Sequence, residues 1–166
     1  MEELELNSIE EKIKIENQFK AGANWFFWIA GLSLVNSVVL LAGSNWGFII
    51  GLGITQFIDA IGLAIAEEVG IAGKIIAFIL DIVAAGIFVL FGVFARKKHS
   101  WAFIVGMVLY ALDGLLFLLV KDILSIGFHI FALACIFSGL KALNKLEQAQ
   151  ISQPLESQPI EAQPLE

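Results

Sequence analysis

The sequence predicts an all-α integral membrane protein, built as a four-helix transmembrane bundle with a re-entrant or interfacial amphipathic helix. The 166 residues are 58% hydrophobic and 16% charged, with a mean hydropathy of +0.85. Soluble domains average about 45–50% apolar and about 25% charged residues. Four stretches are also long and apolar enough to cross a bilayer. The charges gather mainly at the two ends of the chain and in one short loop.

Residues 1–23 form a charged segment that we expect on the cytoplasmic side. Residues 1–20 contain six Glu and three Lys, whereas a cleavable signal peptide has a basic start and an early apolar run. The first apolar stretch is therefore expected to be a retained signal anchor. We expect residues 2–20 to be a solvated lead-in to it; the alternative is a short helix with a weak apolar stripe at Ile9, Ile13 and Phe19.

The four spans are expected at about residues 24–42, 71–95, 101–120 and 123–140. Cytoplasmic loops collect Lys and Arg, so the loop that carries Arg96, Lys97 and Lys98 is placed in the cytoplasm. With four crossings, eight of the ten basic residues are cytoplasmic. With five crossings, the split is five to five. The charges favour four spans and cytoplasmic termini, in the plasma or inner membrane of the cell.

The segment 47–69 is apolar enough to cross a membrane but carries Gln56, Asp59, Glu67 and Glu68. On a helix its branched and aromatic residues gather on one side, with Gln56 and Asp59 toward the other. This pattern is typical of a helix that is half in apolar surroundings. We interpret it as a re-entrant or interfacial helix on the outer side. The alternative is a fifth transmembrane helix whose polar stripe faces the bundle.

One polar residue from each predicted span lies in a common layer in the outer half of the membrane. Asp113 precedes Lys121 by eight residues and His129 follows Asp122 by seven, so both lie ~10–12 Å below the turn between their helices. The candidate layer consists of Asn36, Asp81, Asp113 and His129. Its expected supporting residues are Ser33, Tyr110, Ser125 and Lys74, and Gln56 and Asp59 form a candidate lid.

The layer has two interpretations. Interhelical hydrogen bonds among such residues hold helices together in lipid, whereas ionisable groups within spans also mark ligand and ion sites. The first function class is a non-catalytic protein that binds a lipid or a partner, or acts in scaffolding or assembly. The alternative is an ion, proton or small-solute pathway, formed by an oligomer.

An intramembrane hydrolase is the second alternative, with Asp81 and Asp113 as a pair of carboxyls. The surrounding sequences FILDIVA and YALDGLL lack the glycine-rich context of intramembrane aspartyl proteases. Ser125 and His129 lie on one helix, and the chain has no Gly-x-Ser-x-Gly elbow. We therefore predict no catalytic residue.

No metal or cofactor is predicted. Cys135 is the only cysteine, which excludes an internal disulfide and a thiolate cluster. His129 has no ligand partner at helical spacing. No basic run suggests nucleic-acid binding. The expected partners are the lipid bilayer, further copies of the chain and a protein that docks on the tail.

Residues 143–166 form the predicted tail, after a membrane domain at 24–142. The tail ends in three pentapeptides, SQPLE, SQPIE and AQPLE, at Ser152, Ser157 and Ala162. Proline at every fifth position prevents a regular helix, and so few apolar groups cannot form a core. We expect a disordered acidic cytoplasmic tail. The alternative is that the repeat is a docking motif for a protein partner.

Overall fold

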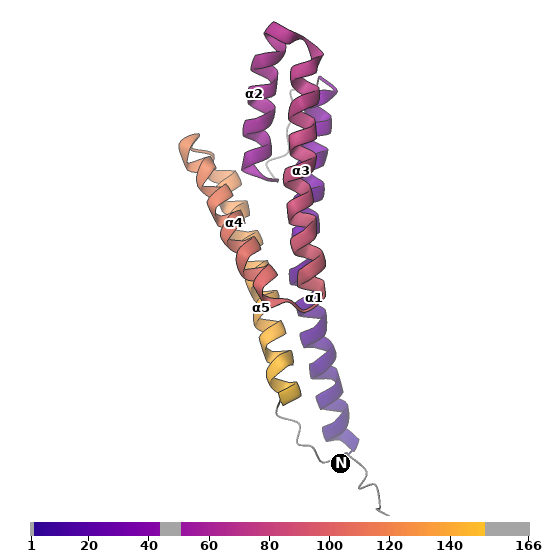
Figure 1. The fold of residues 1–166 in the computed structure, drawn as a ribbon. Coiled ribbons are helices and arrows are strands. Elements are labelled where there is room, and N and C mark those ends of the chain that lie inside the picture. The colour runs from indigo at the N-terminus through magenta and orange to yellow at the C-terminus, as the bar shows by residue number, and fades with distance from the viewer. Residues whose placement is uncertain (1, 44–50, 152–166) are drawn as a thin grey trace, which may run out of the picture.

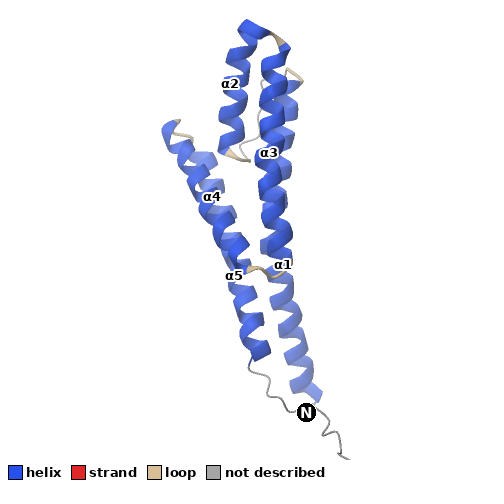
Figure 2. Ribbon diagram, in the orientation of Figure 1, coloured by secondary structure: helices blue, strands red, loops and turns tan. Residues whose placement is uncertain are grey.

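The computed structural model describes residues 2–43 and 51–151, which form five α-helices and contain no strand (Figures 1 and 2). The pentapeptide repeats of the expected tail, at 152–166, lie outside the described residues. The helices are α1 Glu2–Leu41, α2 Gly53–Val69, α3 Ile71–Arg96, α4 Ser100–Leu119 and α5 Ile123–Ile151. The all-α prediction is confirmed, and the starts of the last three helices agree with the expected spans.

Within the described part of the chain, four helices are long and apolar enough to cross a membrane: α1, α3, α4 and α5. Helix α2 has 17 residues and is therefore ~25 Å long, shorter than the ~30 Å hydrocarbon core of a bilayer. The chain is thus a membrane protein with four candidate spans and one shorter helix.

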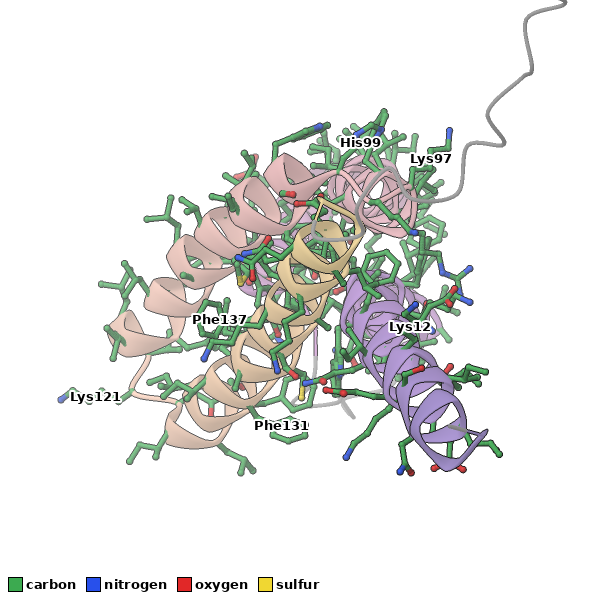
Figure 3. All side chains as sticks on the ribbon, turned by 90° about the horizontal axis from the view of Figure 1, so that it is seen from below. Lys12, Lys97, His99, Lys121, Phe131 and Phe137 are labelled. Atoms are coloured by element: carbon green, nitrogen blue, oxygen red, sulfur yellow. The ribbon has the colours of Figure 1, made fainter. Side chains whose placement is uncertain are left out.

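The four long helices alternate in direction along one axis (Figure 1). We call the direction toward the start of α1 basal, and the direction toward the α2–α3 turn and the α4–α5 turn at Lys121 apical. Helices α1 and α4 run toward the apical end, and α3 and α5 run back. Seen from the basal end, α5 lies between α1 and α4, and Lys121 points away from the bundle (Figure 3).

Helix α2 is re-entrant. The Leu52 N–H, just before α2, donates a hydrogen bond to Ser33 Oγ at 2.7 Å. Ser33 precedes the end of α1 at Leu41 by eight residues, so α2 begins ~12 Å below the apical end of α1. The helix then rises to Gly70, where a φ of 71° turns the chain into α3. The start of α2 inside the bundle agrees with the re-entrant form of the prediction.

Glycines allow α2 to pack closely against α3. A Cβ on Gly62 would lie 2.4 Å from Ala77 Cβ, and a Cβ on Gly73 would lie 2.9 Å from the Gly62 carbonyl oxygen. Small residues at such contacts let helix backbones approach each other in lipid, where no hydrophobic force joins apolar helices. The α2–α3 hairpin therefore packs as one unit.

The first turns of α1 are helical, in place of the expected lead-in, and α5 continues to Ile151, beyond the expected membrane domain. These extensions pack together at the basal end, where Phe19 of α1 and Leu143 of α5 are buried. Gln18 Nε2 also donates to Ser138 Oγ at 2.6 Å. The exposed side of α1 carries the charges, so its sequence showed only a weak apolar stripe.

Phenylalanine rings fill the basal half of the bundle. The Phe26 ring centroid lies 6.1 Å from that of Phe103, 6.2 Å from that of Phe91 and 6.5 Å from that of Phe88. All four rings are buried. A Cβ on Gly106 would lie 2.5 Å from the Phe26 ring. This half of the core is therefore apolar and closely packed.

Asp122 caps the apical start of α5. Its carboxylate accepts the Ser125 hydroxyl at 2.6 Å and the amides of Leu124 and Ser125 at 3.2 Å. The Ser125 hydroxyl and amide hold the pKa of Asp122 below its ordinary value. Because the folded protein favours the ionised form, this stabilisation is present above the ordinary Asp pKa and is lost as the pH falls through the folded value.

Replacing Asp122 with Ala is expected to destabilise the protein by about 0.5–2 kcal/mol, the usual effect of losing a helix cap. Thermal unfolding of wild type and variant at neutral and acidic pH would measure this. The difference should shrink at acidic pH, where the wild-type cap is protonated. An equal difference at both pH values would contradict this role of the carboxylate.

Candidate functional site

The Asp113 carboxylate of α4 binds the first turn of α2. Its Oδ2 accepts the Gly53 N–H at 2.7 Å, and its Oδ1 accepts the Ile54 N–H at 2.8 Å. The first amides of a helix lack partners within that helix and carry partial positive charge. Asp113 supplies both the missing acceptors and an opposite charge. The side chain is 8% exposed, so these bonds are made away from water.

His129 of α5 joins the same carboxylate. Its Nε2 lies 3.0 Å from Asp113 Oδ2, and its Nδ1 lies 2.9 Å from the Ser125 carbonyl oxygen. A carbonyl oxygen can only accept, so Nδ1 carries a hydrogen. The Nε2 contact is a hydrogen bond whose donor is whichever of the two groups carries the hydrogen.

Residues of α4 form a slot for the His129 ring. The Tyr110 ring stacks on the imidazole at 4.2 Å between centroids, with the planes at 16°. The Phe117 ring lies 5.1 Å away on another side. A Cβ on Gly114 would lie 3.0 Å from the imidazole Cδ2. Sequence spacing had suggested that Tyr110 supports Asp113; it instead positions the ring that binds Asp113.

The chain that leads into α2 lies close to α1. A Cβ on Gly51 would lie 3.1 Å from Asn36 Nδ2 and 3.2 Å from Ser33 Oγ. Both residues are buried, and the Ser33 hydroxyl also donates to the Ile29 carbonyl at 2.8 Å. Ser33 therefore holds the backbone before α2, and Asn36 lies against it.

A second polar cluster lies farther toward the apical end, between α1, α2 and α3. Ser37 Oγ donates to Asp59 Oδ2 at 3.0 Å. The Asp81 carboxyl lies beside Ser37 and Asp59 and is 0% exposed. A small cavity adjoins this cluster, and its polar lining is Ser37, Asp59 and Lys74.

A lateral groove opens between α3 and α4, whose ribbons diverge toward the apical end (Figure 1). Its volume is about 360 Å³. The walls are apolar apart from Asp113, at the point where α4 meets the start of α2. The lining residues are Ile54, Ala84, Ile87, Phe88, Leu109, Leu112, Asp113 and Leu116.

The predicted layer thus consists of two clusters. Asp113 and His129 meet, as their matched depth suggested, but Asp81 lies beside Asp59 of α2. The hydrolase hypothesis required Asp81 and Asp113 as partners, and they have different neighbours. Asp59 belongs to the polar cluster and binds α1, while Gln56 is half-buried. Among the described residues, no group of three His, Cys, Asp or Glu side chains could hold a metal ion.

The most important partners that sequence reasoning missed are backbone amides. Nothing in the sequence around Gly53 and Ile54 indicates that their backbone amides bind a carboxylate 60 residues away. Ser37 had a weak signal, because it lies one turn after Ser33 on the same face of α1. Gly114 had no signal in the sequence, because its role is to leave room for the His129 ring.

Comparison with protein-family models, with curated proteins and with solved structures found no match to this chain.

Proposed function

We propose that this chain is a non-catalytic integral membrane protein that binds a lipid acyl chain in the groove between α3 and α4. The observation that carries the proposal is the groove itself: it is apolar, lies within the helical bundle and opens sideways. Ligand sites are mostly apolar concavities with a few polar groups that fix the orientation. Here the polar groups are Asp113 and the first turn of α2.

The size of the groove favours an acyl chain over a partner helix. An α-helix with side chains is about 10–12 Å wide and rises 5.4 Å per turn, so one turn occupies roughly 400–600 Å³. The groove volume of about 360 Å³ is less than this. A hydrocarbon chain is narrower and gains about 0.8 kcal/mol for each CH₂ that it buries, although the membrane around the groove reduces that gain.

Two observations favour binding over catalysis or transport. The two Asp113 oxygens already make three hydrogen bonds, which suits a structural carboxyl better than a nucleophile or general base. Buried Phe rings fill the basal half of the bundle, which disfavours a polar pathway through a single copy of the chain. A pathway between copies is the competing proposal.

The orientation that we propose places both termini in the cytoplasm of a cell (plasma or inner) membrane. Eight of the ten Lys and Arg residues lie toward the basal end in this arrangement, as the positive-inside rule favours. Labelling single cysteines at positions 67 and 100 in intact cells with an impermeant reagent tests it, after Cys135 has been replaced. Position 67 alone should react; labelling at position 100 alone would reverse the orientation.

The groove is tested with Leu112→Trp, which fills it, and with Leu118→Trp as the matched control. Leu118 is on the same helix and is 55% exposed outside the groove. We expect Leu112→Trp to bind phospholipid about tenfold more weakly, as the loss of two buried methylenes would predict. Native mass spectrometry of bound phospholipid measures this. Equal lipid retention by both variants would overturn the proposal.

A further inference from the structure

The Asp81 carboxyl is buried without a hydrogen-bond partner. Its side chain is 0% exposed, and neither oxygen has a hydrogen bond within the described part of the chain. Unsatisfied buried polar atoms are rare in native proteins, and each needs a physical explanation. An ionised Asp at the centre of a membrane helix costs ~2.5–3.5 kcal/mol on insertion scales.

The neighbours of Asp81 make the ionised form still less favourable. Asp59 of α2 and Ser37 of α1 lie beside it, and the Ser37 hydroxyl has two other acceptors, Asp59 Oδ2 at 3.0 Å and the Ser33 carbonyl oxygen at 3.3 Å. Two carboxylates held this close repel each other unless they share a proton. A proton on Asp81 would remove its charge and give it a donor that Asp59 can accept.

From this geometry we propose that Asp59 and Asp81 form a proton-binding site that holds one proton between their carboxyls. The site lies outside the lipid groove and does not depend on it. Binding is a simple exchange: a hydronium ion gives its proton to the carboxylate and leaves as water, and release reverses this step.

The adjoining cavity fits a proton better than a metal ion. Its volume is about 10 Å³, roughly the space of one water molecule, and Asp59 is the carboxyl of the pair that lines it. Lys74 in its wall would repel a metal cation. With one proton bound, the carboxyl pair has a charge of −1, which the Lys74 ammonium balances.

The charged groups of the three helices that pack around the cavity agree with this charge balance. Helix α2 contributes Asp59, and α3 contributes Asp81 and Lys74. The residues of α1 that line the cavity are Ser37, Leu40 and Leu41, and none of them is charged. Losing the proton would therefore leave one uncompensated negative charge between the re-entrant helix and its neighbours.

Infrared spectroscopy of the full chain in lipid vesicles tests the site directly, through the C=O band of protonated carboxyls. Asp81→Asn should remove one carboxyl proton per chain from the neutral-pH spectrum, and Asp59→Asn should shift that band, because the acid loses its acceptor. Glu67→Gln, at the exposed end of α2, is the control and should leave the band unchanged. The difference spectra separate this proton from any proton on Asp113.

Thermal unfolding against pH provides a second measurement. If the folded protein holds a proton that the unfolded chain releases, its stability falls as the pH rises through the release of that proton. Asn has the shape of the protonated acid, so Asp81→Asn should keep the neutral-pH Tm and lose that alkaline decline. An unchanged carboxyl band in Asp81→Asn, or an unchanged decline, would overturn the proposal.

Discussion

Replacing Asp113 with Ala is expected to destabilise the protein by about 3–5 kcal/mol, the usual effect of breaking a buried pair by removing one partner. This corresponds to a Tm lower by roughly 6–20 °C. The variant loses the acceptor of the Gly53 and Ile54 amides and leaves His129 Nε2 without its partner. Thermal unfolding measures the loss, and hydrogen exchange should show faster exchange in α2 than in α1 or α5.

A double-mutant cycle divides this effect between its two causes. His129→Leu should cost less than Asp113→Ala, because Asp113 still holds both amides of α2. The Asp113→Ala/His129→Leu double variant should be more stable than the sum of the single effects predicts, since neither partner of the pair is then left alone. Strictly additive effects, or unchanged exchange in α2, would contradict the capping role.

Replacing Gly22 with Val is expected to cost about 3 kcal/mol, toward the upper end of the range for overpacking. A Cβ at this position would lie 2.4 Å from Gly139 Cα and 2.8 Å from Gly139 N. These are backbone atoms, so no side-chain rotation relieves the overlap. Helices α1 and α5 would have to separate, which also loosens the contacts around Phe19 and Leu143. Thermal unfolding and the yield of folded protein measure this.

Gly31 is the matched control for this substitution, because a Cβ there would meet no atom within 4 Å. It lies on the same helix, α1. Gly31→Val should leave the Tm close to the wild-type value. Equal losses in both variants would indicate that helix propensity, and not the contact with Gly139, determines the effect.

The spans were predictable because lipid imposes a long apolar run on every crossing helix. Such runs mark α3 and α4 to within one residue at either end. The basal extensions of α1 and α5 were harder to predict, since each buries only a narrow stripe against the other. Ile9 and Ile13 of the predicted stripe are 54% exposed, whereas Phe19, its third residue, is buried on the packed face.

The sequence predicted the depth of the site residues in the membrane, but not which residues contact one another. Counting residues from a turn gives the level of a side chain, and this placed Asp113 and His129 together. The neighbours of Asp81 depend on the rotation of three helices and on where the re-entrant helix begins. Residues 44–50, before that start, lie outside the described structure, and their sequence pattern does not specify how deep the chain goes. The pairing of Asp59 with Asp81 therefore could not be inferred from the sequence.

The cap on α2 has a consequence for the synthesis of the protein. Asp113 follows Gly53 by 60 residues, and ribosomes add about 5–20 residues per second, so roughly 3–12 s pass before the acceptor exists. During that interval the first amides of α2 have no carboxylate in the nascent chain, and lipid offers none. We therefore expect α2 to stay in water at the membrane surface until α4 has been inserted. The second helix to be made would then reach its final depth only after the fourth.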